Sequence, residues 1–193
     1  MLATDLPHRF VGSVNYSLPF GRGQRFGGNI PGWANQVIGQ WRLNSIVSVQ
    51  SGYALGLTQT SGQAYSGSRP TFTGTASPLT PGSTHTRLGG AGQSQAYLNA
   101  AAFRTSRAFE LGNVPRSAGG IRGPLTFQDD LSAIKDFPLH EQVRLEFRLE
   151  AFNFLNKVQF GLPNTVFNSS QFGYITTQAN LPRNVQAALK LNF

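Results

Sequence analysis

Strict alternation of apolar and polar residues is the feature of this sequence that most limits its fold. The clearest case begins at Val143, where the odd positions up to Ala151 are all apolar. The even positions between them are charged and carry Arg144, Glu146, Arg148 and Glu150. Successive side chains of a β-strand point to opposite faces, so a period of two gathers the apolar residues on one face. We therefore predict a strand over about 142–155 with one apolar and one charged face.

Further segments with the same period predict an all-β chain of about five long strands. They lie at about 8–18, 41–57, 125–137 and 184–193. Several are longer than the five or six residues usual in soluble strands. The alternation is weakest over 125–137, because Asp129 and Lys135 interrupt its more apolar face. A tight turn over 138–142 would create three cross-strand pairs: Asp136 with Arg144, Leu131 with Leu149, and Asp130 with Glu150.

The connections between these strands differ greatly in length. The turn after Phe137 is tight, the link over 19–40 is of medium length, and 58–124 is long and rich in Gly, Ser, Thr and Pro. A structureless loop of that size does not suit a compact soluble domain. Long strands with short turns on one side and long loops on the other are typical of outer-membrane barrels. We predict an antiparallel up-and-down transmembrane β-barrel segment, incomplete as a barrel, whose one long loop lies outside the cell.

Composition excludes several classes of function. Charged residues make up 12% of the chain, against roughly 25% in typical globular proteins. Cysteine is absent, which removes disulfides and thiol chemistry. His8, His85 and His140 are isolated from one another, and no phosphate-binding loop or Gly-x-Ser-x-Gly elbow is present. We therefore expect no catalytic residue, no metal, no cofactor and no enzymatic activity.

Two groups of residues have candidate roles in such a barrel. The charged positions Arg144, Glu146, Arg148 and Glu150 would face the lumen, where alternating charges pair with their neighbours. Trp41 and Tyr53 lie on the same face of one predicted strand. A tilted strand would separate them by roughly 28 Å along the membrane normal, close to the height of the apolar band. We expect these two residues to belong to the two aromatic girdles.

The charge balance points to an anionic partner. The formal net charge is +8, and Glu110 is the sole acidic residue between 58 and 124. That segment holds six arginines: Arg69, Arg87, Arg104, Arg107, Arg116 and Arg122. Basic loops suit a surface rich in lipopolysaccharide phosphate. We expect outer-membrane lipid and lipopolysaccharide as partners, and no nucleic acid.

Short motifs along nearly the whole chain resemble, in order, the C-terminal barrel region of TonB-dependent outer-membrane receptors. The resemblance is to the Oar-like group, which has a carboxypeptidase-regulatory-like N-terminal domain. The motifs are Asp5–Phe10, Leu18–Gly23, Gln50–Tyr53, Asn99–Phe103, Gly112–Val114, Arg122–Pro124, Asp130–Ser132, Lys135–Phe137, Phe147–Asn156, Phe172–Gly173 and Ala188–Phe193.

The resemblance implies that the chain supplies wall and extracellular loops of a TonB-dependent transporter in the bacterial outer membrane. It also implies that Leu189, Leu191 and Phe193 form the C-terminal signal read by the barrel-assembly machinery. A signal peptide, a plug and most strands of such receptors are not among the 193 residues. We therefore expect a fragment whose partners include the missing N-terminal barrel and plug and, through them, the energy-coupling TonB protein. The transported substrate stays open.

Two alternatives remain open on the sequence alone. One is a small outer-membrane protein that closes its barrel by self-oligomerisation. The other is a soluble basic β-sandwich that binds polyanions. The continuous apolar face of the strands argues against the soluble protein, because exposed apolar patches beyond a few hundred Å² are rare on soluble monomers.

Overall fold

The computed structural model describes residues 5–60, 69–82, 88–139 and 143–193, and the chain divides into two units. The sheet unit comprises Phe10–Val49, Phe127–Lys157 and Leu181–Phe193. The loop unit comprises Met1–Arg9, Gln50–Thr126 and Val158–Asn180. His85, Arg87 and His140 lie outside the described residues.

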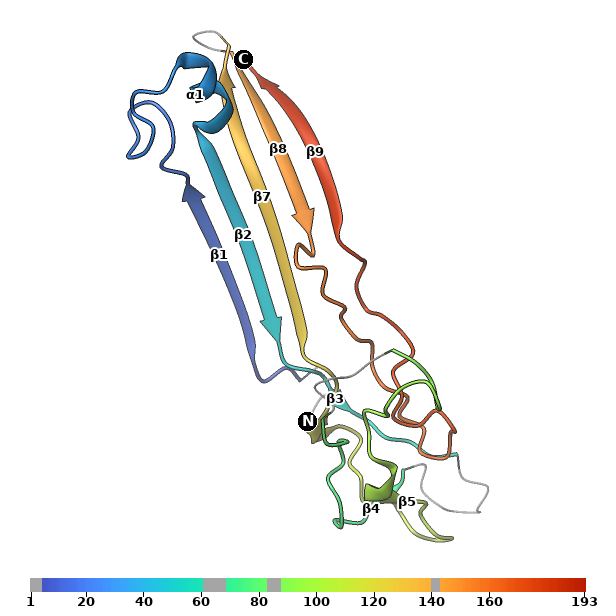
Figure 1. Cartoon of the computed structure of the whole chain (residues 1–193). Helices are drawn as coiled ribbons and strands as arrows, with labels where there is room; N and C mark the ends of the chain where they lie inside the picture. Colours follow the sequence, from blue (N-terminus) through green and yellow to red (C-terminus); the bar gives the residue numbers. More distant parts are fainter. Residues whose placement is uncertain (1–4, 61–68, 83–87, 140–142) are drawn as a thin grey trace. The chain divides into compact units, whose positions relative to one another are not determined.

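The sheet unit is built on one five-stranded antiparallel sheet with the order β1-β2-β7-β8-β9 (Figure 1). Its strands are β1 (Arg9–Ser17), β2 (Trp41–Gln50), β7 (Thr126–Pro138), β8 (Arg144–Phe152) and β9 (Asn184–Asn192). Each strand lies beside the next of these five along the chain, which is the up-and-down arrangement. The expected all-β fold with five strands is confirmed. Over the described residues the sheet is open, with β1 and β9 as its edges.

The register between β7 and β8 differs by two residues from the expected one. The observed pairs are Leu131 with Ala151, Ser132 with Glu150, and Asp136 with Glu146. The predicted pairs of Asp136 with Arg144, Leu131 with Leu149 and Asp130 with Glu150 are therefore wrong. The ladder continues to Pro138 opposite Arg144, and the N–H of Leu139 donates to the carbonyl of Val143 at 2.9 Å. A shift of two keeps every side chain on its face, so alternation could not distinguish these registers.

The strand predicted over 41–57 ends earlier, at Gln50. Beyond it the chain enters the loop unit, where β3 (Ala54–Leu55) pairs with β6 (Ala118–Arg122) across an irregular register. Gly52 lies just beyond this end, where the backbone of Gly123 approaches so closely that a Cβ would collide with its oxygen. The prediction that one continuous strand carries both Trp41 and Tyr53 is wrong.

The loop unit has its own hydrophobic core, which the prediction of one long loop over 58–124 did not include. Short elements cross it: β4 (Thr71–Phe72) pairs with β5 (Phe103–Arg104), and a 3-10 helix spans Ala100–Ala102. Leu57, Leu98 and Ile175 are almost fully buried in its core. The rings of Phe103, Phe167 and Phe172 pack with centroids 5.2–6.0 Å apart. Residues 158–180 thus fold together with the described residues of 54–124.

The helix α1 (Gly32–Ile38) lies in the link between β1 and β2, where no helix was expected. It begins after Pro31, whose φ of −60° suits a helix start, and its first bond runs from Asn35 N–H to the Pro31 carbonyl. Gly39 ends it. Among the helices that the structure describes, none has the length and apolar character needed to cross a bilayer.

Candidate functional site

The even residues of β7 and β8 share one face of the sheet and bring their charges together there. Asp136 stands directly opposite Glu146, a pair of like charges that would repel. Two arginines offset this repulsion. Arg42 on β2 reaches Asp136, with Nη2 2.8 Å from Oδ2, and Arg148 reaches Glu146, with Nη2 2.9 Å from Oε1. The polar face therefore carries ion pairs built from three neighbouring strands.

The predicted charge ladder of β8 forms one network, with the exception of its first residue. Arg148 contacts Glu146 and also Glu150, whose Oε1 lies 3.5 Å from Nη1. Gln186 on β9 donates a hydrogen bond to the other oxygen of Glu150. Arg144 stands at the end of the ladder, opposite Pro138 on one side and Asn192 on the other. The lumen-facing role of these residues remains a prediction.

Sequence reasoning missed three interactions on this face. They are the ion pair of Arg42 with Asp136, the pairing of Asp136 with Glu146, and the hydrogen bond from Gln186 to Glu150. Arg42 and Gln186 occupy even positions of alternating segments, so their face was predictable. Their partners were not, because cross-strand neighbours depend on register.

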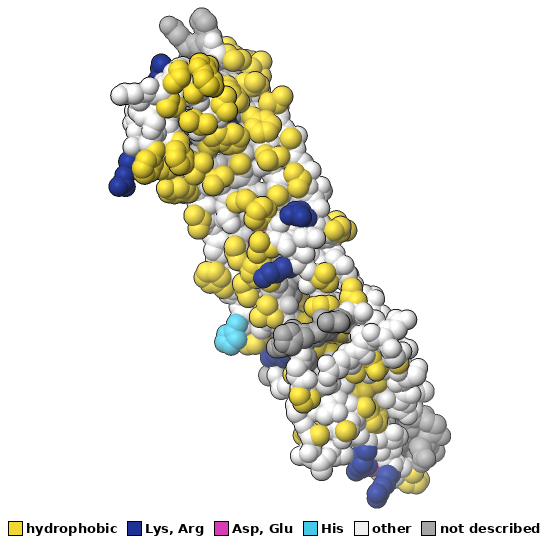
Figure 2. All heavy atoms as spheres, in the orientation of Figure 1, with side chains coloured by type: hydrophobic (Ala, Val, Ile, Leu, Met, Phe, Trp, Pro, Cys, Tyr) yellow, Lys and Arg dark blue, Asp and Glu magenta, His cyan; other side chains and the backbone are white. Residues whose placement is uncertain are grey.

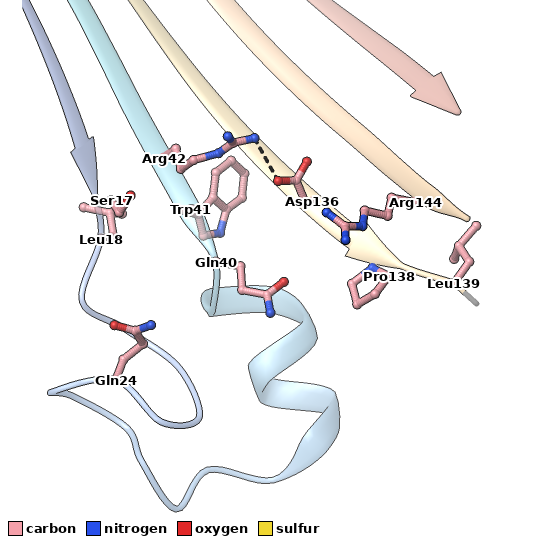
Figure 3. Close-up of a pocket in the computed structure, with 10 residues that line it drawn as sticks. All are labelled: Ser17, Leu18, Gln24, Gln40, Trp41, Arg42, Asp136, Pro138, Leu139 and Arg144. Carbon is pink, nitrogen blue, oxygen red and sulfur yellow. Dashed lines mark hydrogen bonds and ion pairs between the residues drawn. The ribbon is translucent and has the colours of Figure 1, made fainter. Parts of the chain in front are cut away.

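Two hollows lie on the polar face of the sheet unit. The larger, of about 720 Å³, lies at the α1 end, and Figure 3 shows Arg42 bonded to Asp136 there with Arg144 close by. The smaller, of about 360 Å³, is lined by Ser13, Asn15, Asp130, Arg148 and Glu150 among others. Over the described residues no group of three or more His, Asp or Glu gathers where it could hold a metal ion. The face offers hydrogen-bonding groups and balanced charge.

The opposite face of the sheet is apolar and largely uncovered. Phe10 and Val14 on β1 are 64% and 63% exposed, and Leu189 on β9 is 68% exposed. Figure 2 shows hydrophobic side chains gathered along the strands of this unit. Exposed apolar surface of this extent calls for a covering that is itself apolar. A bilayer supplies such a covering.

Lys135 is a charge on this apolar face, and the structure explains how it is accommodated. Its side chain is 2% exposed, and its ammonium lies 5.4 Å and 5.1 Å from the ring centroids of Trp41 and Phe137. It also donates a hydrogen bond to the carbonyl of Gly39 at the end of α1. Cation–π contacts and a carbonyl thus replace water around the charge.

The two predicted girdle residues fall in different units. Trp41 begins β2, meets Phe147 edge to face at 6.2 Å, and donates its indole N–H to the carbonyl of Val37 at 2.9 Å. Tyr53 belongs to the loop unit, where its carbonyl accepts a hydrogen bond from Gly123. The girdle role of either residue stays a prediction.

Asp129, the other charge predicted on the apolar side of β7, is buried and holds the end of the β8 segment. Its Oδ2 accepts the N–H of Leu155 at 2.8 Å, and its carbonyl accepts the N–H of Phe154. The neighbouring Asp130 accepts the N–H of Asn153 at 3.0 Å. The acidic pair therefore binds three successive amides just beyond β8.

The predicted assembly signal occupies the free edge of the sheet. Leu189 and Leu191 are more than half exposed, and Phe193 is 96% exposed. β9 pairs with β8 on one side. Over the described residues its other edge pairs with no strand, and recognition by the assembly machinery stays a prediction.

Several of the loop arginines bind within the loop unit. Arg104 contacts Glu110 through two hydrogen bonds of 2.7 and 2.8 Å, and the backbone N–H of Arg107 donates to the same carboxylate. These bonds, with one from Thr71, lower the pKa of Glu110 to about 2. Arg122 pairs with Asp5 at 2.6 Å, and Arg69 donates to the Val114 carbonyl. Arg107 and Arg116 are exposed.

Comparison with known proteins identifies one family. The family described as "Outer membrane beta barrel domain" matches residues 2–186, which is nearly the whole chain. No curated protein and no solved structure gave a significant match. The match agrees with a sheet that has one uncovered apolar face and one charged face. The chain belongs to the outer membrane beta barrel domain family, and its location is the bacterial outer membrane.

Proposed function

We propose that this chain forms part of the wall and the extracellular loops of a TonB-dependent outer-membrane transporter, and that it catalyses no reaction. The observation that carries the proposal is the charge network on the polar face. The side chains of this network are large and project from three neighbouring strands: Arg42, Asp136, Glu146, Arg148 and Glu150. A narrow barrel has no room for such side chains, whereas a wide barrel around a plug accommodates them.

The open sheet supports the same proposal. β1 and β9 are its edges over the described residues, and hydrocarbon cannot satisfy the unpaired backbone groups of a strand edge. Further strands must therefore pair with both edges in the membrane. In a TonB-dependent receptor they come from the same polypeptide, together with the plug that contacts TonB.

The loop unit suits a position outside the cell. Its buried core gives the loops a defined shape, and its exposed Arg107 and Arg116 are available for the phosphates of lipopolysaccharide. At the other end of the chain, we propose that Leu189, Leu191 and Phe193 are read by the barrel-assembly machinery.

A binding experiment with TonB tests the proposal. The full-length polypeptide that carries this sequence is purified from outer membranes in detergent and mixed with the periplasmic domain of TonB from the same bacterium. We expect a stable complex, which a porin from the same membrane does not form. Absence of a complex would contradict the proposal.

The open edges also favour a second candidate, a small outer-membrane protein that closes by self-oligomerisation. The same preparation distinguishes the two. A polypeptide with the mass of the 193-residue chain that migrates as a heat-sensitive oligomer would favour the oligomer. A longer polypeptide that migrates as a monomer would favour the transporter.

A further inference from the structure

The helix α1 exposes apolar side chains although it contributes none to a core. None of its residues is buried. Trp33 is 74% exposed and Val37 is 61% exposed, and their spacing of four places them on one side of the helix. Phe20 and Phe26, in the turn before the helix, are also exposed. A seven-residue helix is marginal in water, so these residues need an apolar environment from outside.

Two residues of the apolar sheet face hold α1 in place. The Trp41 indole donates to the carbonyl of Val37, and the Lys135 ammonium donates to that of Gly39. The last carbonyls of a helix otherwise need water, and an unpaired carbonyl is costly where apolar surroundings exclude water. Trp41 also packs against Phe147 on the same face. The apolar surface of α1 therefore continues the lipid-facing surface of the sheet (Figure 2).

The turn before α1 is basic. Residues 18–40 contain Arg22 and Arg25 and no Asp or Glu. Arg22 is held by a bond from its Nε to the Ile30 carbonyl, and the guanidinium of Arg25 lies 5.6 Å from the ring centroid of Phe26. Both arginines are exposed. Exposed arginines beside an apolar patch match the anionic headgroups and acyl chains of phospholipids.

The side of the membrane follows from the strand ends. The link that carries α1 shares its end of the sheet with the short turn after β7 and with the end of β9. Short turns of outer-membrane barrels lie on the periplasmic side. The bilayer leaflet on that side consists of phospholipid.

We propose that residues 20–39, which end with α1, form an interfacial anchor that binds anionic phospholipid in the inner leaflet of the outer membrane. Trp33 and Val37 enter the acyl region, and Arg25 contacts headgroup phosphate. The anchor goes beyond the proposed transport function. It depends on membership of the barrel family and on the position of the short turns, and it does not depend on TonB.

Depth measurements on spin-labelled protein test this anchor. The full-length polypeptide carries Trp33→Cys, with any cysteine elsewhere replaced by serine, and is reconstituted in vesicles of phosphatidylethanolamine and phosphatidylglycerol. The label at position 33 should lie about 5–10 Å inside the headgroup boundary, accessible to oxygen and protected from a water-soluble nickel reagent. Gln24→Cys is the matched control, since Gln24 lies in the same turn and lines the polar hollow. Its label should remain accessible to nickel.

Two other results would overturn the anchor. A label at position 33 that is accessible to nickel would place α1 in water. A label protected from both reagents would mean that protein covers the patch, either a second copy or another part of the polypeptide.

Changing the lipid tests whether the anchor requires an anionic headgroup. Replacing phosphatidylglycerol by phosphatidylcholine should make the label at position 33 shallower, and Arg25→Gln should remove that difference. Arg9→Gln, at an exposed arginine of β1, should leave that difference in depth unchanged. An equal depth in both lipids would overturn the role of Arg25. TonB binding by the same samples separates this proposal from the transport proposal, because loss of the anchor leaves the TonB complex intact.

Discussion

Several charges in this protein have partners within a few ångströms, and those partners decide where such a charge is tolerated. Arg148 lies between two carboxylates on the polar face. Lys135 lies among two rings and a carbonyl on the apolar face. Glu110 is surrounded by donors in the loop unit. Removing one partner should therefore cost more than removing an unpaired charge of the same type.

Arg148 provides a direct case on the polar face. In Arg148→Gln, Glu146 and Glu150 lose their shared counter-charge, and Glu146 still faces Asp136. We expect a lower temperature for the loss of the folded band in heat-modifiable electrophoresis. Arg144→Gln, on the same strand and face, should leave that temperature nearly unchanged. Equal effects of the two variants would contradict the network.

The lowered pKa of Glu110 predicts how the stability of the loop unit responds to acid. Its pKa is lowered from 4.5 to about 2, first by the hydrogen bond from Arg104 and then by the N–H of Arg107. A lowered folded-state pKa means stability that is fully present above the unfolded value and lost as pH falls toward 2. Digestion of the loop unit by pepsin should accelerate over that interval. Glu110→Gln should lack this acceleration, and an unchanged pH profile would show that the carboxylate does not matter.

At the scale of elements, sequence reasoning succeeded where the pattern was local. Alternation from Val143 to Ala151 specified β8 and its faces, since each side chain reports its own side of the strand. It could not specify register, because a shift of two leaves every face unchanged. It also extended β2 too far, since the approach of Gly52 to Gly123 involves a residue distant in sequence.

The remaining elements depend on contacts that no local period reveals. The core of the loop unit joins Leu98 and Phe103 to Phe172 and Ile175, which lie at least 69 positions later. α1 had a weak signal, namely Pro31 followed by apolar residues at positions 33, 34, 37 and 38. That signal could not predict the hydrogen bond from the Lys135 ammonium to the Gly39 carbonyl. The sequence nevertheless showed that Lys135 interrupts the apolar face of its strand.

The core of the loop unit makes a quantitative prediction. Leu98 is 0% exposed, and its backbone is bonded to Gly173. Leu98→Ala should destabilise the loop unit by about 2–5 kcal/mol through lost burial and a residual cavity. Hydrogen exchange of the amides of that unit measures this change. Leu111→Ala, at a 76% exposed position, is the control and should have little effect. Similar exchange in both variants would mean that the core does not hold the loops together.

At the scale of the whole molecule, the two open sheet edges determine how the chain can exist in a membrane. Expressed alone, the 193-residue chain should not give a stable monomeric barrel. The unpaired backbone groups of β1 and β9 are costly in hydrocarbon, and a closed five-stranded barrel would exclude the charge network. Size-exclusion chromatography in detergent should show aggregates or larger assemblies. A monodisperse monomer with cooperative unfolding would contradict this expectation.

The central claim is that this sheet forms a barrel wall with lipid on one side and a watery lumen on the other. Cysteine scanning of β8 in native outer membranes tests it most directly. Cysteines replacing Arg144, Glu146 and Arg148 should react with a water-soluble maleimide, and those replacing Leu145, Phe147 and Leu149 with a lipid-phase reagent. The reason is that a slip of one residue would place two arginines in hydrocarbon. Lipid-phase labelling at 144, 146 and 148 with protection at 145 and 147, or reaction of every position with the water-soluble reagent, would contradict the claim.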